Sequence, residues 1–228
     1  MGILIAVDGV DASGKQTHTE LLYQTLAGHG VKAKLLSFPA YGSPSAELVK
    51  LYLSGAFGGN AEDVNAYAAS TFFAADRFAT YRMDWKADYE NGTVLIADRY
   101  VSSNMIHQAG KIENLQEKDR FLDWVSDLEF QIYGIPKPDL TIFLDMPVRF
   151  GRQLMAQREN KFDGTMQKDI HERDCGYLER SYQNACYVAE KYNWTRIPCV
   201  EGERIRSIAE IQKDILCVVE PILKKGSV

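Results

Sequence analysis

A glycine-rich stretch near the start of the chain carries residues suited to binding phosphate, Gly9-Val10-Asp11-Ala12-Ser13-Gly14-Lys15. Its two glycines allow backbone amides to turn inward around phosphate oxygens, and Lys15 can reach the outer phosphates of a nucleotide. An apolar run precedes the stretch and a helical pattern follows it, which favours a nucleotide-phosphate loop over an unoccupied turn. The residues expected to contact the nucleotide are Gly9, Val10, Asp11, Ala12, Ser13, Gly14, Lys15, Gln16 and Thr17.

The position after the loop lysine departs from the usual motif, in which a Ser or Thr hydroxyl ligates Mg²⁺. Gln16 stands there, with Thr17 behind it, and a glutamine carbonyl oxygen is a suitable hard ligand for Mg²⁺. Direct ligation by Gln16, ligation by Thr17 and a contact through water are all open. We therefore treat Gln16 as a candidate metal ligand.

Two charged residues follow a second apolar run, where ligands of open α/β sheets bind. Asp98 is placed to hold Mg²⁺ through water, and the planar fork of Arg99 suits an acceptor phosphate. The alternative for this pair is a salt-bridged strand end. Beside a phosphate loop, the binding interpretation is favoured.

The elements that must position these residues alternate between short apolar runs and longer helical stretches. Five runs predict strands: Gly2–Val7, Lys32–Phe38, Thr93–Ala97, Leu140–Leu144 and Thr195–Val200. Nearly continuous apolar runs are typical of strands buried on both faces of a parallel sheet. We predict one domain over residues 1–228 with a P-loop NTPase-like α/β fold, a doubly wound sheet of about five parallel strands flanked by helices.

The second half of the chain adds two local signals. Ser207-Ile208-Ala209-Glu210 is a capping-box pattern that predicts the start of the last helix, and Pro221 is expected to end or kink that helix. The stretch Arg149–Arg173 is rich in charged residues and glutamine and poor in apolar ones. It predicts a mobile lid insert over about residues 149–173.

The composition limits the classes of function. With 228 residues, 46% hydrophobic and 25% charged, the chain is an ordinary globular protein, and its net charge of −5 argues against a nucleic-acid partner. No apolar run approaches the roughly 20 residues needed to span a bilayer, and no basic segment precedes the first strand. We therefore expect a cytoplasmic protein without a membrane partner, with its four widely spaced cysteines reduced.

Five motifs occur in the order known from one family: Gly9-x-Asp11-x-x-Gly14-Lys15, Phe38-Pro39, Phe73-x-x-x-Arg77, Asp98-Arg99-Tyr100 with Ser103, and Pro136-Lys137-Pro138-Asp139-Leu140. Over about residues 1–150 the chain resembles the thymidylate kinases (dTMP kinases), which are P-loop nucleoside monophosphate kinases. The resemblance implies transfer of the γ-phosphoryl group of ATP to dTMP, giving dTDP and ADP. It also implies Mg²⁺ as cofactor and a homodimer.

The resemblance further implies roles for individual residues. Asp11 would take the 3′-hydroxyl of the dTMP sugar, Phe73 would stack on thymine, and Arg77 would hydrogen-bond the edge of the base. Phe73 and Arg77 are four residues apart and share one helix face, which supports their pairing independently. The alternatives are core packing for Phe73 and a surface ion pair with an acid such as Asp76 for Arg77. The residues expected to bind dTMP are Asp11, Phe38, Phe73, Arg77, Arg99, Ser103, Asn104 and Gln108.

If Arg77 binds the base, its removal should lower kcat/KM for dTMP and hardly change stability.

Two positions depart from the family pattern. Tyr41 stands where many members have an arginine for the acceptor phosphate, and Ala12 stands where some have an arginine after the loop aspartate. The resemblance then implies that the lid supplies the cation for the transition state. We expect Arg158 to be this cation, with Arg152 and Lys161 ranked behind it. The expected catalytic residues are Lys15, Asp11, Arg158 and Arg99.

Other functions share parts of this pattern. A deoxynucleoside kinase would have the same fold and loop but accept thymidine rather than dTMP. A kinase for another nucleoside monophosphate would differ only in its base pocket. A P-loop switch that binds nucleotide without phosphorylating a metabolite is a third alternative. The chain has no Asn-Lys-x-Asp motif for guanine, which argues against a GTPase switch.

Overall fold

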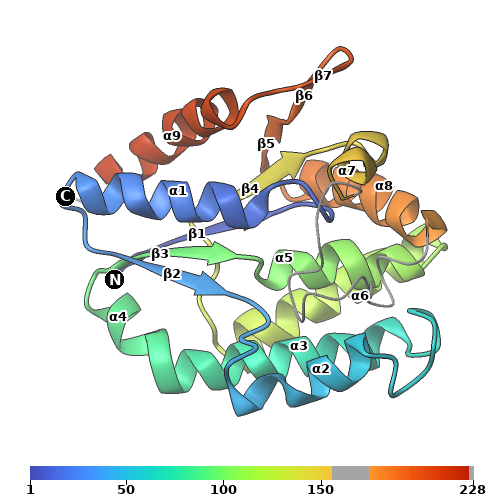
Figure 1. The fold of residues 1–228 in the computed structure, drawn as a ribbon. Helices are drawn as coiled ribbons and strands as arrows, with labels where there is room; N and C mark the ends of the chain where they lie inside the picture. The colour runs from blue at the N-terminus through green and yellow to red at the C-terminus, as the bar shows by residue number, and fades with distance from the viewer. Residues whose placement is uncertain (156–174, 226–228) are drawn as a thin grey trace.

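The computed structural model describes residues 1–155 and 175–225. Their main feature is a five-stranded parallel sheet in the order β2-β3-β1-β4-β5 (Figure 1). Its strands are β1 (Ile3–Asp8), β2 (Ala33–Ser37), β3 (Val94–Asp98), β4 (Leu140–Asp145) and β5 (Thr195–Pro198). All five predicted strands, and the parallel α/β fold they define, are confirmed.

Helices cover both faces of the sheet, as a doubly wound fold requires. The helices are α1 (Lys15–Gly28), η1 (Pro44–Ala46), α2 (Glu47–Leu53), α3 (Ala66–Thr80), η2 (Tyr81–Trp85), α4 (Lys86–Glu90), α5 (Val101–Ser103), η3 (Asn104–Gln108), η4 (Ala109–Lys111), α6 (Leu115–Ser126), η5 (Asp127–Ile132), α7 (Val148–Met155), α8 (Cys175–Lys191) and α9 (Ile208–Lys225). Of the short segments, η2, η3 and η5 are π-helical.

Two apolar clusters lie on opposite faces of the sheet. On one face, Ile5 and Val7 of β1 pack with Leu22 of α1 and Ile215 of α9. On the other face, the alternate residues of β1 pack with α3, η2 and α6. Because successive strand side chains point to opposite faces, a single apolar strand serves both clusters.

The register of the sheet determines where the loops emerge. Val7 of β1 is paired with Asp98 of β3, and Asp8 is paired with Phe143 of β4. The strands run parallel, so their carboxyl ends lie at the same edge of the sheet. The phosphate loop after β1 and Arg99 after β3 therefore leave the sheet side by side.

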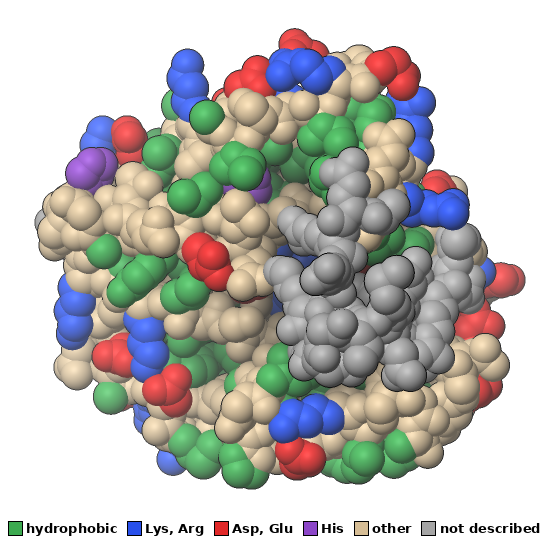
Figure 2. All heavy atoms as spheres, in the orientation of Figure 1, with side chains coloured by type: hydrophobic (Ala, Val, Ile, Leu, Met, Phe, Trp, Pro, Cys, Tyr) green, Lys and Arg blue, Asp and Glu red, His purple; other side chains and the backbone are tan. Residues whose placement is uncertain are grey.

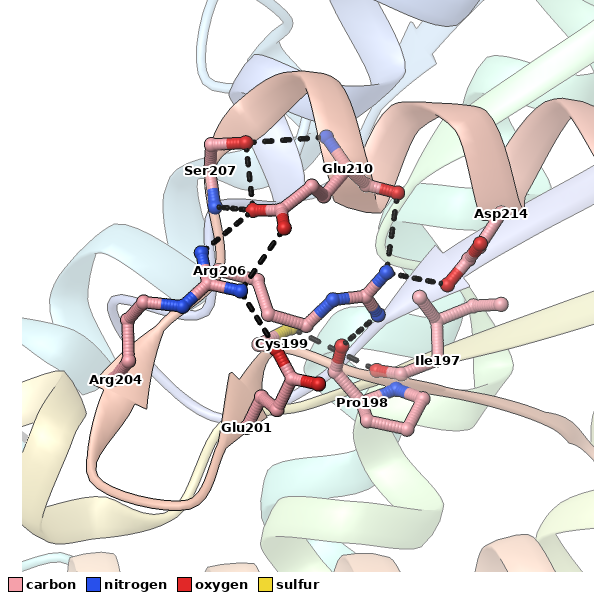
Figure 3. Close-up of polar contacts among 9 residues, drawn as sticks. All are labelled: Ile197, Pro198, Cys199, Glu201, Arg204, Arg206, Ser207, Glu210 and Asp214. Carbon is pink, nitrogen blue, oxygen red and sulfur yellow. Dashed lines mark hydrogen bonds and ion pairs between the residues drawn. The ribbon is translucent and has the colours of Figure 1, made fainter.

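The start of α9 confirms the predicted capping box (Figure 3). The amide of Glu210 donates to Ser207 Oγ, and the amide of Ser207 donates to Glu210 Oε2. Arg204, on the small hairpin formed by β6 (Val200–Glu201) and β7 (Arg204–Ile205), pairs with the same Glu210. These contacts anchor α9 next to the end of β5.

Pro221 does not end this helix, because α9 continues to Lys225. Proline removes one amide donor, which here would have bonded the carbonyl four residues earlier, at Cys217. Cys217 lies on the exposed side of α9, where water can satisfy that carbonyl.

The predicted lid is described only at its start. Its first residues form α7, in which Arg152 is exposed, whereas Arg158, Lys161 and Arg173 lie outside the described residues. In the described part of the chain, Cys186, Cys199 and Cys217 are free thiols. A search of the same part finds no helix with the length and apolar character needed to cross a bilayer.

Candidate active site

The loop between β1 and α1 has the backbone geometry that a phosphate site needs. Gly9 has a φ of 158° and Gly14 a φ of 86°. A Cβ on Gly9 would lie 2.7 Å from the carbonyl oxygen of Leu144, so no other residue fits there without displacing the backbone. Ser13 Oγ is buried without a hydrogen-bond partner among the described residues. The loop is thus shaped by its glycines, and one of its hydroxyls is available to a ligand.

Lys15 opens α1 and folds back over the loop. Its Nζ donates to the carbonyl oxygens of Gly9 and Val10, both at 2.8 Å. Burial and the nearby charge of Arg99 lower the pKa of Lys15 to about 8, against the opposing effect of the surrounding carboxylates. A bound phosphate would supply the negative charge that keeps this ammonium protonated.

An ion pair joins the phosphate loop to the end of β3. Arg99 Nη2 donates to Asp11 Oδ1 at 2.7 Å. Burial alone would raise the pKa of Asp11, but the charges of Arg99 and Lys15 outweigh it and hold that pKa well below its usual range. Asp11 is therefore a carboxylate at any working pH, and it holds the arginine expected to bind the acceptor phosphate.

A cavity opens beside this ion pair. Its wall combines apolar and aromatic side chains with a few charged and polar groups, as sites for small ligands do. The residues that line it are Asp11, Phe38, Pro39, Tyr41, Leu53, Phe73, Arg77, Arg99, Ser103, Asn104, His107 and Gln108. This set contains every residue that the sequence analysis assigned to dTMP, so the structure brings all eight of them together at one cavity.

Phe73 lies on α3 and is half-buried, with one part lining the cavity. It also packs edge-on against the ring of Tyr52, with ring centroids 6.1 Å apart. Tyr52 is held in turn by Lys111, whose Nζ donates to its hydroxyl at 2.9 Å. The binding and packing alternatives for Phe73 are thus compatible, because the packing fixes the ring at the cavity wall.

Arg77 is not the surface residue that the ion-pair alternative assumed. It is 1% exposed and forms a bidentate pair with Glu129, through Nε and Nη2, both at 2.6 Å. Its neighbour Asp76 instead accepts the amide of Ala40 and the hydroxyl of Ser45, which fixes the loop after β2. The alternative of a surface ion pair between Arg77 and an acid such as Asp76 is therefore wrong.

The burial of this pair also contradicts the expectation that Arg77 can be removed at little cost in stability. Glu129 is completely buried, and without Arg77 its charge would be left without compensation.

Three polar residues near the cavity were missed by the sequence analysis: Asp8, His107 and Glu129. Asp8 is completely buried and accepts the Gly9 amide, while its other oxygen accepts the hydroxyls of Ser102 and Ser103. His107 Nε2 lies 3.2 Å from Arg99 Nη1 and accepts its hydrogen. Asp8 could have been identified from the sequence, because it is a carboxylate at the end of a continuous apolar run. No sequence feature marks Glu129.

The candidate metal ligands supply oxygen atoms but not a complete coordination shell. Asp98 is close enough for its charge to raise the pKa of both Lys15 and Arg99. Gln16 is exposed, and its Nε2 donates to Glu20 at 2.8 Å. The described residues contain no cluster of three or more His, Cys, Asp or Glu able to hold a metal. This donor set fits Mg²⁺, which keeps several water and phosphate ligands.

Lys15 should make nucleotide binding depend on pH. With a pKa of about 8, Lys15 is protonated at pH 7 and loses its proton as the pH rises, so ATP must then bind together with a proton. We expect the Kd for ATP to be constant near pH 7 and to rise by up to about tenfold per pH unit above pH 8. Isothermal titration calorimetry between pH 6.5 and 9.5 measures this. Lys15→Met should bind weakly without this rise, and a flat profile in the unmodified protein would contradict the role of Lys15.

Arg77 should matter for stability as well as binding. Arg77→Met leaves the buried Glu129 carboxylate unpaired, and we expect it to lower the free energy of unfolding by about 3–5 kcal/mol. The double variant Arg77→Met/Glu129→Met removes both charges and should lose clearly less. Urea unfolding followed by circular dichroism compares the two. A single variant as stable as the double would show that the pair is not isolated from solvent.

The profile of the family described as thymidylate kinase matches residues 7–198. Similar proteins include the thymidylate kinase of Mycobacterium tuberculosis (strain ATCC 25618 / H37Rv), 33% identical over 78% of this chain and 82% of that protein. The probable thymidylate kinase of Thermococcus gammatolerans is 28% identical over 99% of this chain and its own full length. The human thymidylate kinase is 32% identical over 64% of this chain and 61% of that protein. The protein therefore belongs to the thymidylate kinase family.

Proposed function

We propose that the loop of residues 9–17 binds ATP, that the adjacent cavity binds dTMP, and that the γ-phosphoryl group passes between them to give dTDP and ADP. Family membership supplies the reaction, phosphorylation of dTMP by ATP. The observation that carries the assignment to this site is the Asp11–Arg99 ion pair, because Asp11 belongs to the loop and also lines the cavity. Donor and acceptor would meet at this pair.

For the acceptor, we assign Arg99 to the phosphate of dTMP, Phe73 to the face of the base and Arg77 to its edge. Asp11 would take the 3′-hydroxyl of the sugar. Gln108 supports the same placement, because its Oε1 is buried in the cavity wall without a hydrogen-bond partner among the described residues. Phe38, Ser103 and Asn104 complete the set.

The chemistry asks the protein to position charges rather than to form covalent bonds. Lys15 would neutralise charge on the outer phosphates of ATP, while Arg99 would hold the attacking phosphate oxygen in line with the γ-phosphorus. Mg²⁺, when bound, supplies further neutralisation of the phosphates, and Asp98 and Gln16 are the residues that would hold it. Asp11 fixes the guanidinium of Arg99 in place.

A further cation is needed because Ala12 provides none in the loop itself. We propose that Arg158 supplies it, with Arg152 and Lys161 as the next candidates. Arg158 and Lys161 lie outside the described residues, so the assignment rests on the sequence: the stretch 149–173, whose first residues belong to α7, is rich in basic residues.

We also propose that the chain is a single domain with this lid, located in the cytoplasm, and that it forms a homodimer. Exposed apolar side chains on α2 and α3 support the dimer, and Figure 2 shows green side chains along the edge where these helices lie. The exposed large apolar residues of these two helices are Leu48, Leu51, Tyr67 and Phe78. A second copy covering them would remove apolar surface from water.

The acceptor assay tests the reaction class. With Mg²⁺ and ATP, we expect the protein to phosphorylate dTMP far faster than thymidine, AMP, CMP or GMP, because Arg99 and the cavity would recognise a nucleotide that already carries a phosphate. Coupled ADP release across these acceptors measures it. Equal or better turnover of thymidine would favour a deoxynucleoside kinase, and ADP release independent of any acceptor would favour a nucleotide switch.

Single-turnover kinetics test the lid cation. A transition-state arginine can contribute about 10³–10⁵ in rate, so Arg158→Ala should lower the rate of the chemical step by at least roughly 10²-fold. Affinities for ATP and dTMP should change much less, because the contact belongs to the transition state. Arg152→Ala and Lys161→Ala serve as comparisons. A near-normal step in all three variants would refute a lid cation.

A further inference from the structure

Glu129 does not line the cavity, yet it contacts two residues that do. It lies in the π-helical segment η5, and its side chain is completely buried. One of its carboxylate oxygens, Oε1, accepts both Arg77 Nη2 at 2.6 Å and Asn104 Nδ2 at 3.2 Å. Its other oxygen accepts Arg77 Nε. A single buried carboxylate therefore holds an arginine and an asparagine side by side at the cavity wall.

These contacts determine which way the amide of Asn104 points. Its Nδ2 donates to Glu129 and also to the backbone carbonyl of Ser70, at 3.2 Å each. Neither partner has a hydrogen to donate, so the nitrogen rather than the oxygen of the amide must face them. Asn104 Oδ1 is consequently left as the atom that can serve a ligand, and it can only accept.

The guanidinium of Arg77 is restricted in the same way. Glu129 uses the hydrogen of Nε and one hydrogen of Nη2, which leaves the hydrogens of Nη1 and the second hydrogen of Nη2 for a ligand, and these groups can only donate. The cavity wall thus offers a donor from Arg77 next to an acceptor from Asn104. Without Glu129 the guanidinium of Arg77 would lose both of these acceptors, and the Ser70 carbonyl would be the one acceptor left to orient the Asn104 amide.

This order of donor and acceptor matches one type of pyrimidine. Thymine and uracil present a carbonyl oxygen, O4, beside a hydrogen on N3. Cytosine presents an amino group beside an unprotonated N3, which is the reverse pattern. We propose that Glu129 is a specificity-determining positioning residue, which selects thymine over cytosine by fixing the Arg77 donor and the Asn104 acceptor. The inference rests on the proposed binding of dTMP in this cavity.

The test compares three acceptors, dTMP, dUMP and dCMP, through kcat/KM at saturating ATP and Mg²⁺. Because dUMP has the same base edge as dTMP, it reports on every effect except the edge pattern. We expect the unmodified protein to prefer dTMP over dCMP by at least about 100-fold, since dCMP would leave buried polar groups unpaired. In Glu129→Gln, an amide NH2 replaces one acceptor, so Arg77 loses one of its two fixing contacts and the Asn104 orientation is held by Ser70 with weaker support from residue 129. The ratio of dTMP to dCMP should then fall by at least about tenfold, while the ratio of dTMP to dUMP stays constant.

Partial unfolding of a variant would not change the ratio of dTMP to dCMP. Each ratio is measured on one preparation, so the fraction of active enzyme cancels. Glu129→Asp keeps the charge that compensates Arg77, but its shorter side chain reaches Arg77 and Asn104 less well. We expect it to lower the ratio of kcat/KM for dTMP to that for dCMP as well. Ile215→Ala removes buried apolar volume on the opposite face of the sheet and serves as the destabilised control with an unchanged ratio.

Three results would overturn the inference. The first is that Glu129→Gln and Glu129→Asp both keep the ratio of the unmodified protein. The second is that the unmodified protein uses dCMP as well as dTMP, which the donor and acceptor order forbids. The third is that the unmodified protein turns over neither dTMP nor dUMP, and this result alone would also refute the proposed function.

Discussion

The parallel pairing of β1 with β3 is the constraint on which the rest of the site depends. Because Val7 is level with Asp98, the phosphate loop and Arg99 leave the sheet at the same height and can reach one another. Asp8 strengthens this junction, since one carboxylate oxygen holds the Gly9 amide while the other holds the hydroxyls of Ser102 and Ser103. The donor loop and the helix that follows Arg99 are therefore tied to a single buried side chain.

The charged residues in this region form compensated pairs. Asp11 and Arg99 form a partly buried pair, and Arg77 and Glu129 form a buried pair whose arginine lines the same cavity. Such pairs contribute little to stability relative to apolar packing, yet breaking one of them is costly because it leaves a buried charge. Their value here is geometric: each pair holds an arginine in one orientation although the chain as a whole is acidic.

The sequence was most informative where one residue or a short run determines the outcome. Short apolar runs predicted every strand of the parallel sheet, and the loop at Gly9–Lys15 was recognisable from its glycines and lysine. Pairings between distant residues were not predictable in this way. Arg77 and Glu129 are 52 positions apart and meet only in the folded chain, so the alternative to base binding considered a neighbour such as Asp76 as the partner of Arg77 rather than Glu129. Pro221 does not end α9 for a different reason, because an exposed helix face tolerates one missing amide donor.

Arg77 and Asn104 are buried and hydrogen-bonded, so their side chains lose conformational entropy when the protein folds rather than when a ligand binds. A long side chain that is immobilised only on binding costs about 0.5–1.5 kcal/mol of affinity. Here Glu129 and the carbonyl of Ser70 hold both side chains before any ligand arrives, so that loss belongs to folding. The cavity wall is preorganised: a base that matches it binds without this entropic cost, and a base that does not match finds groups that cannot rearrange to accommodate it.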